Sequence, residues 1–267
     1  MNSTFKKWQK WLIAIKIFPI IIFVAVLKFL SHKYGYEVLE LNALFTSLVA
    51  GTIFLIGFLI SGVLSDYKES EKIPSEITSS LKALFDDAFT LYKSKENENS
   101  YQFIEYQRVV GVCLLDWLYK KKRTAEMLSL ISSMNEYFVE FDKSGTQPNY
   151  IIRLKGEQNN LRRLILRVDT IRDTGFVSSA YAVVEIMGML IATGLIITEI
   201  EPFYASLFLT SLVTFLITYM LFLIKDLDNP FDYSINGENG TEVSLKPLHD
   251  HILFLNEKKH QIIKLNK

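Results

Sequence analysis

The sequence of 267 residues contains one cysteine, Cys113, and its 29 basic side chains balance its 29 acidic ones. A single cysteine cannot form a disulfide within the chain, which is typical of a protein whose soluble part faces a reducing interior. We expect Cys113 to pack inside an apolar helix. A net charge of zero gives no bulk attraction to phosphate backbones, so we predict no nucleic-acid partner.

Signatures of catalysis and of cofactor binding are also missing. There is no phosphate-binding glycine loop, no nucleophile elbow and no metal-binding pair at helical i, i+4 spacing. His249 and His251 flank Asp250 near the end of the chain, and we interpret them as part of a polar surface segment. These absences predict a protein that is not an enzyme and holds no cofactor and no resident metal ion.

Long apolar blocks are what the sequence has instead. Hydrophobic residues make up 49% of the chain, the mean hydropathy is +0.20, and the apolar residues gather in a few blocks. A helix needs about 20 apolar residues to cross a bilayer. Four blocks are long enough, and they predict membrane spans at Trp11–Leu30, Ala43–Leu64, Phe176–Thr198 and Phe203–Ile224.

The order of these blocks predicts an all-α fold, namely a polytopic membrane protein with four transmembrane helices and a helical cytoplasmic domain. An N-terminal segment with the first hairpin takes residues 1–64, the cytoplasmic domain 65–175, the second hairpin 176–224 and a cytoplasmic tail 225–267. Helical periodicity without strand patterns fills the long insert. It predicts helices at Ser75–Tyr92, Tyr101–Lys122, Ala125–Phe141 and Ile151–Ile171.

Basic residues predict the orientation of the chain in the membrane. They flank one side of the predicted spans, at Lys6, Lys7, Lys10, Arg162, Arg163, Arg167, Arg172 and Lys225. Because basic loops stay in the cytoplasm, both termini and the long insert are predicted to be cytoplasmic. We expect a multi-pass protein of the plasma membrane, the inner membrane of a bacterial cell.

Glu185 is the one carboxylate within the third predicted span. A charge at the centre of a membrane helix costs roughly 2.5–3.5 kcal/mol on insertion scales. Glu185 should therefore face water, a charged partner or a pore, or else be a protonated or hydrogen-bonded structural residue between helices. The sequence leaves both interpretations open.

The second span carries a regular stripe. Residues at every third or fourth position share one helix face: Ala50, Phe54, Phe58 and Ser61–Ser65. Gly57 and Ser61 form a small-xxx-small pair that permits close helix approach. Periodicity alone is compatible with ordinary packing and lipid exposure. However, no helix breaker follows Leu64 before Pro74, and a helix that continues out of the membrane suits a pore wall.

This stretch resembles the bestrophin family of ion channels. In that family the second membrane helix carries an apolar neck, I-x-x-x-F-x-x-G-F, whose counterparts here are Ala50, Phe54, Gly57 and Phe58. After the fourth span, Asn229, Pro230 and Phe231 are similar to the family's N-P-F turn, and Ser244–His249 resembles its L-P-L-D segment. The order of spans agrees over essentially the whole chain, although Asp66–Tyr67–Lys68 replaces the family's Arg-Trp-Trp.

The resemblance implies a channel of five identical subunits around an axial pore in the lipid bilayer. Ala50, Phe54 and Phe58 would form rings of an apolar neck that gates small monovalent ions by dewetting. Ser61 and Ser65 would continue the pore wall. Three small residues of the same helix would let neighbouring helices pack closely or flex: Gly51, Gly57 and Gly62.

The resemblance also bears on calcium. Animal members carry an acidic run after the N-P-F turn that forms a calcium clasp, and here that run is reduced to Asp232 and Glu238. We therefore predict no calcium gating. The carboxylates that remain to be considered as calcium ligands are Asp228 and Asp232.

Ion selectivity and two other functions stay open. Apolar rings carry no charge preference, and the family includes both anion-selective and cation-preferring branches. Acidic loops opposite the cytoplasmic side favour cations or weak selectivity, at Glu37, Glu40, Glu199 and Glu201. A secondary transporter, suggested by Glu185 and a kink at Pro19, is one alternative. The other is a non-conducting scaffold or sensor whose helical domain binds a partner.

Overall fold

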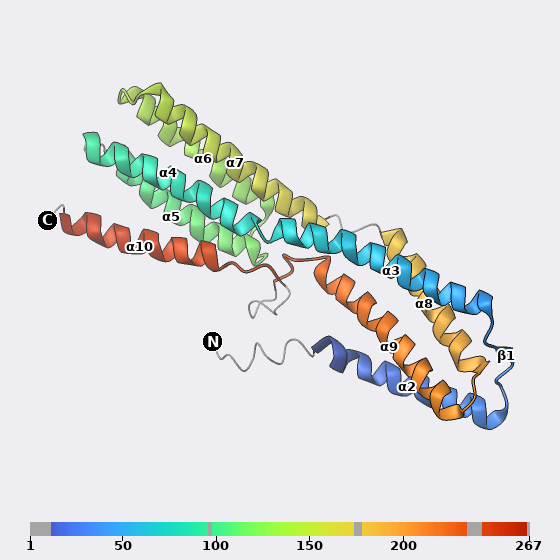
Figure 1. Ribbon diagram of the computed structural model, residues 1–267. Coiled ribbons are helices and arrows are strands. Elements are labelled where there is room, and N and C mark those ends of the chain that lie inside the picture. Colours follow the sequence, from blue (N-terminus) through green and yellow to red (C-terminus); the bar gives the residue numbers. More distant parts are fainter. Residues whose placement is uncertain (1–11, 96–97, 174–177, 234–241, 266–267) are drawn as a thin grey trace. The chain divides into compact units, whose positions relative to one another are not determined.

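A computed structural model describes residues 12–95, 98–173, 178–233 and 242–265 (Figure 1). The chain divides into two compact units. We call Met1–Tyr67 with Gly175–Asn229 the membrane unit, and Lys68–Thr174 with Pro230–Lys267 the insert unit. The residues before Leu12, which include basic residues used above for orientation, lie outside the described residues, as do Phe176 and Glu238.

Among the described residues, four helices are long and apolar enough to cross a bilayer, as predicted. They are α2 (Leu12–Tyr34), α3 (Ala43–Ser70), α8 (Ser178–Ile197) and α9 (Phe203–Leu227). The expected extension of the second span is confirmed, because α3 continues past Leu64 to Ser70. The all-α, polytopic fold class is therefore correct.

Apolar side chains join three of these helices. Helix α9 packs against α2 and α8. A shared cluster holds buried residues of α3, α8 and α9: Ile56, Leu59, Val63, Val184, Ile191, Leu195, Ile217 and Ile224. Gly194 permits the contact between α8 and α3, because a Cβ there would lie 2.5 Å from Cε2 of Phe45.

Two very short strands also occur in the described part of the chain, and the sequence analysis did not predict them. They are β1 (Leu39–Glu40) and β2 (Thr198–Glu199), which pair in parallel. Leu39 is opposite Thr198, and Glu40 is opposite Glu199. Strands of two residues are too short for a period of two to be recognised in sequence. They join the segment before α3 to the end of α8.

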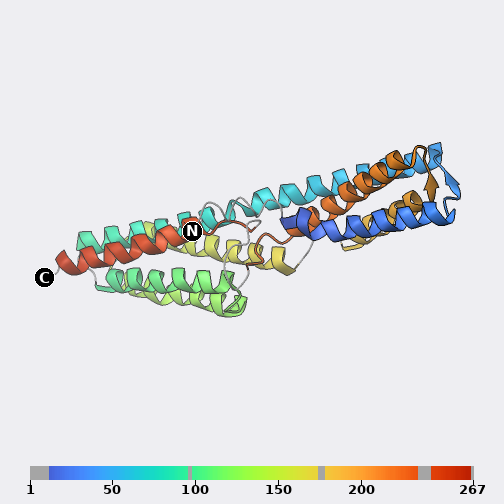
Figure 2. The same ribbon diagram turned by 90° about the horizontal axis from the view of Figure 1, so that it is seen from below.

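The insert unit is a bundle of helices with roughly parallel axes (Figures 1 and 2). It contains α4 (Ile73–Lys95), α5 (Glu98–Leu118), α6 (Thr124–Lys143), α7 (Pro148–Asp173) and α10 (Lys246–Leu265). The four helices predicted for this region are confirmed, with shifted ends. Helix α5 ends earlier than predicted, and Lys120, two residues beyond it, has a φ of 59° that an α-helix does not allow. Cys113 is buried in α5, as expected.

Helix α10 corrects the interpretation of the C-terminal segment as polar surface. It packs against α4 and α5. The approach to α5 is close, because a Cβ at Gly111 would lie 3.1 Å from Cγ1 of Ile252. His249 is exposed, but His251 is buried at 5% exposure. The placement of His251 on a polar surface was therefore wrong.

His251 makes the stability of this packing dependent on pH. Burial lowers the pKa of His251, the positive charge of Lys82 lowers it further, and Asp86 opposes both. The side chain of His251 therefore binds a proton more readily in the unfolded chain than in the folded one. Its contribution to the free energy of unfolding is fully present above about pH 6.5 and falls as the pH drops below that value. We expect the melting temperature to decrease from about pH 7.5 to about pH 5.5 in the wild type and to decrease less in His251→Gln. The exposed-site variant His249→Gln should keep the wild-type slope.

Candidate functional site

Helix α3 presents two opposite faces in the membrane unit. Thr52, Ile56, Leu59 and Val63 are buried. Successive residues of an α-helix are rotated by about 100° about its axis. On this basis five other residues of α3 lie within a sector of about 80°, on the side of the helix opposite to the buried residues. We call them the α3 stripe: Ala50, Phe54, Phe58, Ser61 and Ser65.

The α3 stripe is uncovered in the single chain. The side chain of Phe54 is 74% exposed and that of Phe58 is 70% exposed. Two adjacent exposed phenylalanines on a membrane helix can face lipid, another protein chain or the axis of an assembly. Ser61 and Ser65 extend the same face with hydroxyl groups towards the end of the helix. The face is therefore apolar first and polar afterwards.

Gly51 and Gly57 of α3 do not support close packing within the described part of the chain. In the described part of the chain, a Cβ added at Gly51 or at Gly57 would meet no atom within 4 Å. Gly62 is half-buried. If Gly51 and Gly57 permit close approach of another helix, as predicted, that helix lies outside the described part of this chain.

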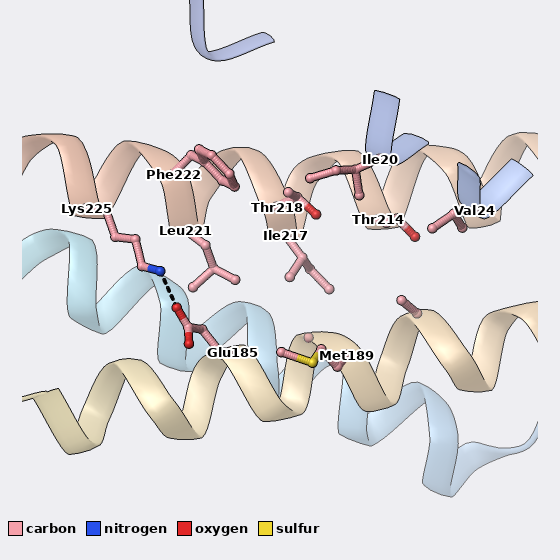
Figure 3. A pocket seen from close by; sticks show the side chains of 12 residues that line it. Ile20, Val24, Glu185, Met189, Thr214, Ile217, Thr218, Leu221, Phe222 and Lys225 are labelled. Carbon is pink, nitrogen blue, oxygen red and sulfur yellow. Dashed lines mark ion pairs between the residues drawn. The ribbon is translucent and has the colours of Figure 1, made fainter. Parts of the chain in front are cut away.

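Glu185 has a charged partner that the sequence did not reveal. Its carboxylate forms an ion pair with the ammonium of Lys225 in the last turn of α9. Both residues line a cavity of about 360 Å³ between α2, α8 and α9 (Figure 3). The rest of the wall is mostly apolar, apart from Thr214 and Thr218. The pair joins α8 to α9, so it fits both interpretations from sequence, namely a charge that faces a partner and a hydrogen-bonded structural residue between helices.

A second charged cluster lies where α2 ends and was missed in the sequence. Lys28 is completely buried, and its Nζ lies 2.6 Å from Oε1 of Glu37 and 2.5 Å from the carbonyl oxygen of Thr198. Nδ1 of His32 lies 2.7 Å from Oε2 of the same carboxylate. The ring of His32 stacks on Phe203 at 4.2 Å. This cluster joins the loop before α3 to the segment between α8 and α9.

The pKa of Glu37 reflects these contacts. Burial alone would raise it, but hydrogen bonds and charge from His32 and Lys28 outweigh burial, so the pKa lies below the ordinary value. Glu37 therefore stays ionised, and the ammonium of Lys28 offsets its negative charge. Glu40 and Glu199 differ, because they lie opposite each other in the strand pair, are exposed, and have no cationic partner among the described residues. Of the four acidic residues singled out in the loops, Glu37 thus contributes least to a negative surface.

The N-P-F turn is well packed on its insert-unit side. Phe231 is completely buried, and the carbonyl oxygen of Pro230 accepts a hydrogen bond from the amide of Val243 at 2.9 Å.

Arg172 stacks 5.0 Å from the ring of Trp117 and donates to the carbonyl oxygen of Leu118 at 2.6 Å. Burial lowers the pKa of Arg172, although nearby acidic groups oppose the shift.

The two residues considered for calcium both take part in interactions within the chain. Asp232 forms an ion pair with Lys120. Asp228 ends α9, where its backbone amide donates to the carbonyl of Ile224 at 3.0 Å. Within the described ranges, no three His, Cys, Asp or Glu residues gather in a way that could hold a metal ion. Glu238 lies outside the described residues.

Known proteins provide a family for this arrangement. Residues 13–236 match the bestrophin-like domain. The fold is similar to that of a point mutant of a bacterial bestrophin homologue from Klebsiella pneumoniae, with a TM-score of 0.77, 12% identity, and coverage of 91% of this chain and 98% of the other. A second crystal structure of the Klebsiella homologue gives a TM-score of 0.72 at 13% identity, with coverage of 91% and 95%. No curated protein sequence matches.

Proposed function

The chain belongs to the bestrophin-like family, and on that basis we propose that it is an ion channel for small monovalent ions. The observation that carries the proposal is the α3 stripe, a membrane helix face with two exposed phenylalanines followed by serines. Exposed aromatic rings on a helix that continues past the apolar segment suit the wall of a pore better than a surface within one subunit. Both termini and the insert unit are proposed to be cytoplasmic, in a plasma membrane.

In this proposal five copies surround an axis and each contributes one α3. Ala50, Phe54 and Phe58 then form three successive apolar rings, and Ser61 and Ser65 line the wider path that follows. A narrow apolar tube loses its water and stops ions, whereas slight widening restores the flow. The uncovered positions Gly51 and Gly57 are available for contact with the adjacent copy.

Cations are the proposed permeant ions. The support is the exposed pair Glu40 and Glu199, which precedes α3 and follows α8 in the chain. Five copies of this pair would concentrate cations near the start of α3, because clefts of one charge sign raise the local concentration of the opposite ion. Glu37 adds little, since the ammonium of Lys28 offsets its charge.

The test is the reversal potential of the purified protein in a planar bilayer under a KCl gradient. We expect the reversal potential to lie nearer to the equilibrium potential of K⁺ than to that of Cl⁻. One carboxylate attracts a cation at about 4 Å by about 1 kcal/mol in bulk water. Glu40→Gln with Glu199→Gln should therefore lower the cation-to-anion permeability ratio severalfold, while Glu40→Asp with Glu199→Asp keeps it.

The outcomes separate the parts of the proposal. If the wild type and the variant Phe54→Ala/Phe58→Ala both form folded oligomers and neither carries current, the result would favour the non-conducting scaffold. A reversal potential nearer to the equilibrium potential of Cl⁻ would still show a channel, but it would reject cations as the permeant ions. An unchanged permeability ratio in the glutamine double variant would remove Glu40 and Glu199 from selectivity.

A further inference from the structure

We propose that the cavity between α2, α8 and α9 holds one acyl chain of a zwitterionic phospholipid, with the lipid phosphate at Lys225 and the lipid ammonium at Glu185. The cavity measures about 360 Å³, which is within the range of about 300–1,000 Å³ for ligand pockets. It lies within the membrane unit, so the ligand that surrounds it at the highest concentration is lipid.

The walls match a hydrocarbon chain. Apolar side chains from all three helices make up most of the lining: Ile20, Val24, Met189, Ile217, Leu221 and Phe222. Figure 3 shows Ile217 and Leu221 of α9 pointing towards the side of α8 that carries Met189, with the ion pair at one end. The cavity is therefore amphiphilic along its length, as a lipid is.

The charges at the polar end select the headgroup. Lys225 and Glu185 remain 58% and 35% exposed while they pair with each other. An anionic headgroup would satisfy the ammonium of Lys225 but would meet the carboxylate of Glu185 as a like charge. A headgroup with adjacent phosphate and ammonium groups offers one partner to each side chain, and leaves no charge unpaired in a medium of low dielectric constant. Lys225 also lies at the C-terminus of α9, where the helix dipole favours a cation.

Native mass spectrometry of the detergent-solubilised full chain tests the proposal by competition between phosphatidylethanolamine and phosphatidylglycerol. The two probes share acyl chains and phosphate, but only the first carries an ammonium. We expect the wild type to retain phosphatidylethanolamine about tenfold better, the discrimination typical of one charge-assisted hydrogen bond. Glu185→Gln keeps the shape of the cavity and frees Lys225, so this variant should reverse the preference towards phosphatidylglycerol.

A pair of matched variants tests the location. Ala192→Phe fills the cavity and should abolish retention, whereas Leu190→Phe places the same ring two residues away on α8, outside the lining. Size-exclusion chromatography checks the assembly of both. Retention by Ala192→Phe equal to that of the wild type would overturn the site. Equal headgroup preference in the wild type and Glu185→Gln would overturn the charge pairing even if Ala192→Phe fails to fold.

Discussion

Replacing Phe54 and Phe58 together by alanine should raise the resting conductance by about tenfold or more. Both rings are exposed on the α3 stripe, so the truncation leaves the buried face of α3 intact. In the proposed assembly the two changes widen two successive apolar rings, and a wider neck stays wet. A decrease of about 1.4 kcal/mol in the barrier to permeation is enough for a tenfold increase in current.

The measurement is single-channel and macroscopic current in planar bilayers at equal protein content. The matched control is Leu48→Ala with Leu55→Ala. These leucines are also exposed on α3, but at about 100° per residue they lie about 60° or more beyond the α3 stripe. The control removes similar apolar volume from the same helix and should leave the current unchanged.

Equal currents from wild type and Phe54→Ala/Phe58→Ala would exclude the α3 stripe from the pore. An increase in both double variants would point to general loosening of the membrane unit instead. Only an increase confined to the phenylalanine pair supports the neck.

Periodicity was the part of the sequence that predicted structure well. The spacing of Ala50, Phe54 and Phe58 predicted one shared face, and the structure has these residues exposed on one side of α3. The same signal located the four helices of the insert, whereas the length of the apolar blocks located the four spans. Periodicity does not say what covers a face, because that depends on other chains or on lipid. The role of the α3 stripe as a neck therefore stays a prediction.

Contacts between distant segments were not predictable. Lys28 lies inside an apolar block, and its carbonyl partner Thr198 is 170 residues away in the chain. The partner of Glu185, Lys225, also comes from a different helix. Helix α10 is an intermediate case. Leu248, Ile252 and Leu255 have helical spacing and are buried, but the polar residues around His251 concealed the pattern.

The cluster around Lys28 gives the second large expected effect, on stability. Glu37→Gln should lower the free energy of unfolding by about 3–5 kcal/mol, because it leaves the ammonium of Lys28 buried without its counter-charge. Lys28 is completely buried while Glu37 retains 10% exposure, so water cannot readily replace the carboxylate. For a chain of this size the melting temperature should fall by roughly 10 °C.

A double-mutant cycle separates the charge pair from the packing around it. Lys28→Met removes the ammonium and keeps an apolar stem of similar length. Combined with Glu37→Gln, it leaves no buried charge in the pair, and exchanging a buried pair for neutral groups is often close to neutral. The double variant should therefore melt well above Glu37→Gln alone. The exposed-site control Glu40→Gln should stay within about 0.5 kcal/mol of the wild type.

Acid should weaken the same cluster in a defined direction. Since the pKa of Glu37 in the folded protein is below its ordinary value of 4.5, its contribution is present above that value and is lost as the pH falls through the folded pKa. Glu37→Gln should remove this acid dependence while His251→Gln leaves it in place, because His251 acts in the insert unit and at higher pH. A Glu37→Gln variant as stable as the wild type, or a double variant that melts no higher than Glu37→Gln, would show that Lys28 keeps its charge paired through carbonyl oxygens alone. The loop before α3 would then be held by the strand pair and by apolar contacts such as Phe45 against Gly194.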